Sequence, residues 1–437
     1  MSGNLNLRCG IGASPCGSSG RPRHPRAVRL CLRGSRLGCA ELPAPRLPRA
    51  PSPLPLLILL PLLLGLLARP ALAAGADYGL RGLATTWETD DDNSILQLVA
   101  LPRAASGAKV EVVGPFLWYD SPENSNLELL PCAMAYDAGA GGNASRPAAF
   151  YFASGNSLGA VRIYTVDAVS GVLLRNASVR AADGGGAAPA LAVTALAFNS
   201  QSGLLDALAF AGVAAEPQAI SIDPVSGAVR VLAARLELPD FQGPCEASVA
   251  PHASAGSRLY FVQQNARGWQ EANQTFLMAL ELATGNVSRL VPWSPRDGML
   301  SNVAAVDAAS PGGAELVLYT TSAWDQDLNV TAELTLRALD PLLPGSSAVV
   351  AVIANPQAGD GPLLPTWGTL ACDGAGAART VSMLATNNNG RIYTYVIELN
   401  VTVGATGVTA SGEPAITKID DSDVTGGMIY RMNRVVA

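Results

Sequence analysis

"RIYTVDAVSGVLLRNASV" runs from Arg162 to Val179. Apolar and polar residues alternate on both sides of Ser170-Gly171, as they do in half-buried β-strands. A glycine between two such runs supplies the positive φ that tight hairpin turns need. The stretch therefore predicts a strand, a turn and a second strand.

The same pattern recurs along the chain. A turn that contains glycine separates two apolar runs at Gly107, Gly171, Gly227, Gly285, Gly345 and Gly404–Gly407, which are about 60 residues apart. A fixed period of this size is typical of a repeat protein. Each unit contains four strand-like runs, which we call a, b, c and d in chain order. In the third unit they are 193–198, 205–211, 219–222 and 229–234.

Four antiparallel strands that repeat radially form the blade of a β-propeller. Six units fill residues 75–437, but the first unit lacks strand a. We expect Gly427–Val435 to supply the missing strand, which would leave no open sheet edge in the ring. The predicted fold is thus an all-β, six-bladed β-propeller closed by its C-terminal strand, after an N-terminal signal or anchor segment.

The stretch "IYTVDAVSGVLL" (Ile163–Leu174) resembles the Y-x-x-D-x-x-T/S-G repeat of the YVTN and quinoprotein-like propeller superfamily. The resemblance implies a propeller fold. Quinoproteins carry a Trp a few residues after the glycine, but Val172–Arg175 contain none, so no quinone cofactor is expected.

Residues 1–74 differ from the rest of the chain. Residues 1–50 contain nine Arg and a single acid, Glu41, and the apolar run Leu54–Ala68 follows. A basic region, a short apolar run and Ala71-Leu72-Ala73 are typical of a secretory signal. Two alternatives stay open: an uncleaved membrane anchor with a basic tail, and an organelle transit peptide ahead of a signal.

Charge and sequons indicate the environment of the remainder. Residues 75–437 carry 19 Lys and Arg against 34 Asp and Glu, which argues against a nucleic-acid partner. Membrane contact is expected only through an uncleaved N-terminal segment. N-glycosylation sequons favour an extracellular or cell-surface location, with an organelle lumen as the alternative. The sequons start at Asn143, Asn176, Asn273, Asn286, Asn329 and Asn400.

The six tryptophans fall in connections that share one face of the predicted propeller, because b–c and d–a connections leave the same ends of the strands. Trp118, Trp293 and Trp367 are assigned to d–a connections, and Trp87, Trp269 and Trp324 to b–c connections. Asp120, Asp297, Asp325 and Asp327 accompany them. An indole beside carboxylates suits a sugar ring, which needs an apolar surface and hydrogen-bond partners, and it also suits a protein interface.

Two acidic runs, Asp90–Asp92 and Asp420–Asp423, are candidate oxygen ligands for Ca²⁺. The individual residues are Asp90, Asp91, Asp92, Asp420, Asp421 and Asp423. The alternative is that both acidic runs are exposed to solvent and bind no metal. No other cofactor is expected.

The sequence contains few candidate catalytic residues. Residues 75–437 contain a single histidine, His252, which we assign to an a–b turn, so a histidine-rich zinc site is excluded and a Ser-His-Asp triad would depend on that one residue. Strand a positions Cys132, Thr194, Cys245 and Asn302 are expected near the propeller axis. The cysteines Cys132, Cys245 and Cys372 allow at most one disulfide.

The sequence thus favours a secreted or cell-surface propeller that binds a glycan or an extracellular protein without catalysis. One alternative is a Ca²⁺-dependent hydrolase of the lactonase or phytase kind. A second is a structural component of an extracellular matrix, in which the tryptophans only pack.

Overall fold

The computed structural model describes residues that all belong to Gly75–Ala437, the second of the two units into which the chain divides. The described residues are 77–87, 94–103, 107–119, 128–139, 146–155, 161–181, 191–211, 216–238, 249–255, 257–264, 275–292, 298–306, 315–322, 333–343, 345–356, 363–366, 368–374, 376–387, 394–419 and 429–435. Within these ranges, no helix is long and apolar enough to cross a membrane.

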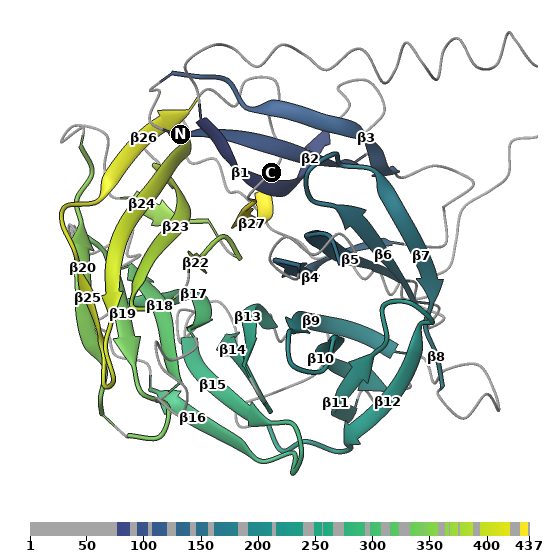
Figure 1. Cartoon of the computed structure of the whole chain (residues 1–437). Helices are drawn as coiled ribbons and strands as arrows, with labels where there is room; N and C mark the ends of the chain where they lie inside the picture. Colours follow the sequence, from purple (N-terminus) through teal and green to yellow (C-terminus); the bar gives the residue numbers. More distant parts are fainter. Residues whose placement is uncertain are drawn as a thin grey trace, which may run out of the picture. The chain divides into compact units, whose positions relative to one another are not determined.

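The strands form six sheets around a common axis, so the chain is a six-bladed β-propeller (Figure 1). From the axis outward, blade 1 is β27 (Ile429–Arg434), β1 (Asp77–Trp87), β2 (Ser94–Arg103) and β3 (Glu111–Tyr119). Blade 2 is β4 (Glu128–Asp137), β5 (Ala149–Gly155), β6 (Val161–Asp167) and β7 (Leu173–Ser178). Blade 3 is β9 (Leu191–Asn199), β10 (Leu204–Ala211), β11 (Glu216–Ile222) and β12 (Ala228–Ala233), with β8 (Arg180–Ala181) added beside β12. Blade 4 is β13 (Val249–Ala255), β14 (Arg258–Gln264), β15 (Thr275–Glu281) and β16 (Val287–Val291). Blade 5 is β17 (Met299–Val306), β18 (Leu316–Ser322), β19 (Leu334–Leu339) and β20 (Ala348–Ile353). Blade 6 is β21 (Leu363–Pro365) with β22 (Ala371–Asp373), then β23 (Ala378–Asn387), β24 (Thr394–Val403), and β25 (Val408–Ala410) with β26 (Ala415–Ile419).

The predicted closure of the ring is confirmed. The last strand, β27, pairs antiparallel with β1, and Leu80 lies opposite Arg434. β27 therefore serves as strand a of blade 1, and the chain ends beside the axis (Figure 1).

The recurring glycine turn joins strands c and d, as expected. In blade 2, the carboxylate of Asp167 accepts hydrogen bonds from the backbone N–H groups of Val169 (3.1 Å) and Ser170 (2.7 Å). Gly171 then takes a φ of 69°, in the left-handed region that favours glycine. Asp and glycine thus have separate roles: the acid fixes the turn, and the glycine reverses the chain.

The same glycine also makes a close contact between blades. A Cβ added to Gly171 would overlap the carbonyl oxygen of Val113, on the outermost strand of blade 1. In the next blade, a Cβ on Gly227 would overlap the carbonyl oxygen of Ser178, on the outermost strand of blade 2. The turn of one blade therefore lies against the outermost strand of the blade before it.

The apolar core is divided among the seams between blades. The buried apolar side chains form six clusters, and each cluster combines residues from two adjacent blades. Leu96 of blade 1, for example, lies in one cluster with Phe150 and Phe152 of blade 2. Because each sheet is covered on both faces, central strands such as β5 and β18 are buried along their whole length.

The outermost strands carry an irregularity that the sequence did not predict. In blades 2 to 5, the pairing of strand c with strand d skips one residue of strand d. The skipped residues are Leu174, Leu232, Leu290 and Val350. Three of them, Leu232, Leu290 and Val350, are partly buried against the clusters between blades.

The substitution Gly171→Ala tests the contact between the glycine turn and the preceding blade. We expect it to lower the free energy of unfolding by about 3 kcal/mol, because it adds an overlap to the strain of a positive φ. Chemical denaturation gives the value.

Gly345→Ala is the matched control, since Gly345 has a φ of 77° but an added Cβ would meet nothing within 4 Å. It should cost only about 1 kcal/mol. Equal losses in the two variants would mean that the contact between blades contributes nothing.

Candidate functional site

The two ends of the propeller differ in the connections they carry. We call the end with the a–b and c–d turns the hairpin face, and the end with the b–c and d–a connections the inter-blade face. The pairing of Trp87 with Ser94 marks the inter-blade end of blade 1, and the pairing of Met299 with Ser322 marks that of blade 5.

Two of the predicted ligand-binding tryptophans lie in strands. Trp87 is the last residue of β1, and Trp118 is the second-last residue of β3, opposite Leu96. Both backbones therefore lie at the inter-blade end of blade 1. Their side chains are outside the described part of the molecule, as are Asp120, Trp269, Trp293, Asp297, Trp324, Asp325, Asp327 and Trp367.

The innermost strand of blade 6 is divided into two segments, β21 and β22. Trp367, which the sequence assigned to a d–a connection, comes between these two segments in the sequence and lies outside the described residues. The break arises because Ala385 pairs with Pro365 whereas Ser382 pairs with Ala371.

Asn302 fixes both sides of this break. It is buried on β17 of blade 5, where it donates from Nδ2 to the carbonyl of Thr366 (3.0 Å) and accepts at Oδ1 from the N–H of Gly368 (2.7 Å). Asn302 does lie on strand a, as predicted, but its amide joins two blades. Thr194, also on strand a, is half-buried and donates to the carbonyl of Leu208 at 3.3 Å.

The metal prediction cannot be placed on the structure. Asp90, Asp91, Asp92, Asp420, Asp421 and Asp423 all lie outside the described residues. Among the residues that are described, no three His, Cys, Asp or Glu side chains come together as metal ligands would.

The remaining candidates for nucleophilic chemistry lie in strands or in connections between strands. His252 belongs to strand β13, not to the predicted a–b turn. The segment Gly155–Gly159 has the pattern G-x-S-x-G, but it joins β5 to β6 and not a strand to a helix, which a nucleophile elbow requires. Cys372 is a free thiol, and burial raises its pKa to about 12, so it stays protonated. The side chains of Cys132 and Cys245 lie outside the described set.

Three sequon asparagines lie within the described part of the chain, and all three are exposed. Asn176 is on the outermost strand of blade 2, Asn286 in a hairpin turn of blade 4, and Asn400 on β24. Asn143, Asn273 and Asn329 lie outside the described residues.

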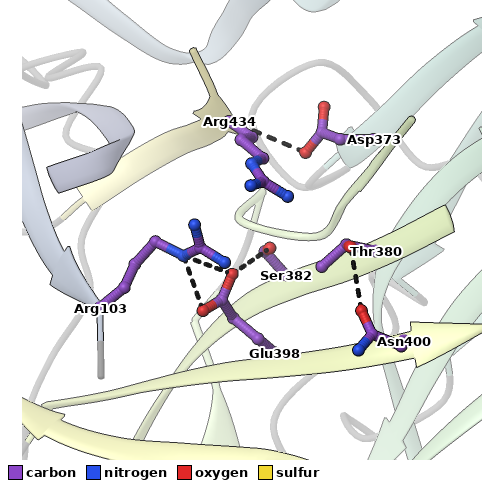
Figure 2. A network of polar contacts seen from close by, with 7 residues as sticks. All are labelled: Arg103, Asp373, Thr380, Ser382, Glu398, Asn400 and Arg434. Carbon is purple, nitrogen blue, oxygen red and sulfur yellow. Dashed lines mark hydrogen bonds and ion pairs between the residues drawn. The ribbon is translucent and has the colours of Figure 1, made fainter. Parts of the chain in front are cut away.

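The seam between blades 6 and 1 carries a polar network (Figure 2). Nε of Arg103 on β2 lies 2.8 Å from both carboxylate oxygens of Glu398 on β24, and both side chains are mostly buried. Ser382 donates to the same carboxylate at 3.5 Å. This ion pair joins the first and last blades of the ring.

A second polar cluster lies on the innermost strands of blades 6, 1 and 2. The carboxylate of Asp373, at the end of β22, accepts a hydrogen bond from the backbone N–H of Arg434 at 3.3 Å (Figure 2). Tyr136 of β4 donates from its hydroxyl to the carbonyl of Arg434 at 3.1 Å. Burial raises the pKa of Asp373 to about 6, despite the neighbouring Arg434 and Arg431. Sequence reasoning missed this cluster, because no pattern links residues so far apart in the chain.

Comparison with known proteins finds likeness of fold only. No protein-family model and no curated protein matches the sequence. An α-L-arabinofuranosidase from Lactobacillus brevis is similar in structure, with 14% identity, a TM-score of 0.37, and coverage of 65% of this chain and 95% of that chain.

Two other solved structures are similar to the same degree. For the cobalt-substituted apocarotenoid oxygenase of Synechocystis, the identity is 11%, the TM-score 0.39, and the coverage 74% of this chain and 72% of that chain. For the Aleuria aurantia lectin in complex with Fucα1-6GlcNAc, the identity is 10%, the TM-score 0.37, and the coverage 77% and 95%. No ligand or activity transfers at such values.

The ion pair between Arg103 and Glu398 yields a direct test. We expect Arg103→Gln to lower the free energy of unfolding by about 3 kcal/mol, because it leaves a mostly buried carboxylate without its partner. The double variant with Glu398→Gln should lose less than the two single losses combined.

Arg103→Lys is the control for this cycle. A lysine keeps the charge but loses the planar guanidinium, so we expect an intermediate loss. Additive effects of Arg103→Gln and Glu398→Gln in chemical denaturation would show that the two side chains are not coupled.

Proposed function

We propose that this β-propeller is a non-catalytic binding module whose ligand, a carbohydrate or an extracellular protein, binds at the inter-blade face. The observation that carries the proposal is the distribution of tryptophans. Trp87 and Trp118 lie at the inter-blade ends of β1 and β3, and in the sequence Trp269, Trp293 and Trp324 follow strands that end on the inter-blade face. The hairpin turns contain none.

The chemistry of these connections supports a carbohydrate as the first ligand to test. Tryptophan offers a flat apolar surface for the C–H face of a sugar ring, and the carboxylates of Asp120, Asp297, Asp325 and Asp327 offer acceptors for its hydroxyls. The hairpin face is less suitable, because the turns at Gly171 and Gly227 pack against the preceding blade. The resemblance to YVTN and quinoprotein-like propellers belongs to the same proposal, and it names no ligand.

The proposal includes the secretory route, with an extracellular or cell-surface location and an organelle lumen as the alternative. The exposure of Asn176, Asn286 and Asn400 leaves these sequons accessible to glycosylation.

Binding to an array of glycans, with the full chain secreted from eukaryotic cells, is the experiment. If a glycan is bound, Trp324→Ala should weaken binding at least about 10-fold, since a stacked indole is a typical hot spot. Titration calorimetry with the glycan that binds gives the affinity.

Leu342→Ala is the matched control, because Leu342 is 60% exposed in the hairpin turn of the same blade. The affinity of this variant for the glycan should equal that of the unsubstituted chain. Equal losses in both variants would place binding elsewhere than on the inter-blade face. If no glycan binds, screening against cell-surface proteins with the same pair of variants separates a protein ligand from a structural role.

The alternative of a Ca²⁺-dependent hydrolase makes the opposite prediction for metal removal. We expect binding to persist in EDTA, because tryptophan stacking needs no metal. Loss of binding in EDTA, with recovery on adding Ca²⁺ but not after Asp91→Asn, would favour the alternative and would lead to assays with lactones and phosphate esters.

A further inference from the structure

The strand that closes the ring is held from both sides at its C-terminal end. Asp373 of blade 6 accepts the backbone N–H of Arg434 at 3.3 Å and also bonds to the side chain of Asn433. Tyr136 of blade 2 donates to the carbonyl of Arg434 at 3.1 Å. The final residues of β27 are thus joined to blades 6 and 2, while hydrogen bonds to β1 hold the strand within blade 1.

Asp373 is the group in this cluster whose charge changes in the range of ordinary solution pH. Burial and the charge of Asp373 raise the pKa of Tyr136 above its usual value, and burial raises that of Cys372 to about 12, so both stay neutral. Burial lowers the pKa of Arg431 to about 10, so Arg431 stays cationic. Arg434 adds a second positive charge beside the carboxyl group.

Ionisable groups on the other strands around Asp373 do not cancel the effect of its titration. The charged residue of β23, Arg379, acts on Cys372, the neighbour of Asp373. β17, which also contacts β22, has no ionisable residue. On β4, Asp137 lies beside Tyr136 and is paired with Arg146 at 2.8 Å.

We propose that Asp373 is a pH-responsive latch for the closing strand β27, and that it holds the ring more firmly in mildly acidic than in neutral solution. This inference is independent of what the inter-blade face binds. The physical reason is that the ionised carboxylate loses more hydration on burial than its two arginines restore. When the group is protonated, its carbonyl oxygen still accepts the N–H of Arg434 and the cost of a buried charge disappears.

The direction of the pH effect follows from the shift. The carboxyl titrates near its ordinary value of 3.8 in the unfolded chain and at about 6 in the folded chain. The folded state therefore binds the proton more tightly. The extra stability is fully present below about pH 4 and is lost as the pH rises through about 6.

The experiment compares the full chain with Asp373→Asn in chemical denaturation between pH 4 and pH 7.5. The ratio of folded to unfolded chain, taken relative to that of the variant, should fall about 100-fold over this range, which corresponds to a pKa shift of about two units. Parallel pH profiles for the two proteins would overturn the proposal.

Asp223→Asn is the matched control, and it should give the opposite slope. The hydroxyl of Ser226 donates to Asp223 and lowers its pKa, so this acid stabilises the fold at neutral pH and loses its effect as the pH falls. A falling profile for both acids would indicate a general charge effect and not a latch.

If Asp373→Asn does not fold, hydrogen exchange on the unsubstituted chain tests the same proposal. The peptide that covers β27, corrected for intrinsic exchange, should open less often at pH 5 than at pH 7.5. Equal opening of β27 at both pH values would refute the latch.

Discussion

The burial of both faces of every sheet against its neighbours is the constraint on which this propeller depends. There is no single core: the buried apolar side chains form six clusters, each shared by two blades. A missing blade would expose two such clusters to water, so the ring is stable only when it is closed. Three sets of contacts hold the closing strand and its neighbours: the hydrogen bonds from β27 to β1 within blade 1, the ion pair of Arg103 with Glu398 between blades 1 and 6, and the contacts of Asp373 of blade 6 and Tyr136 of blade 2 with Arg434.

The packing of the blades also divides the molecule into a constrained face and a freer one. On the hairpin face, Gly171 and Gly227 lie so close to the preceding blade that no side chain fits between them. Packing therefore restricts which residues can occupy these two turn positions. The inter-blade connections contain most of the tryptophans. Function on a propeller is carried by its loops, which is why we propose that the ligand binds at these connections.

The fold could be predicted because its determinants are local. The alternation of apolar residues and the glycine at each c–d turn repeat with a fixed period, and they are visible without knowing any partner. Long-range pairs were not visible. The break in strand a of blade 6 depends on Asn302, 64 residues from Thr366, and the bond from Arg434 to Asp373 spans 61 residues. His252 was misassigned because the pattern locates strands but not the residues at which they begin and end. For the candidate site, the sequence identifies residue types and connections, while the geometry of those side chains depends on loops outside the described residues.

The pairing of β27 with β1 imposes an order on the making of this protein. Leu80 lies opposite Arg434, about 350 residues later in the chain. Blades 2 to 6 are each built from consecutive residues and can assemble as the chain leaves the ribosome, but blade 1 cannot be completed before β27 has been synthesised. Until then β1 is paired with β2 alone, and its open edge must be shielded from the edges of other chains. A deletion within β27 would leave the ring open, whereas a change of similar size in an exposed hairpin would alter one turn.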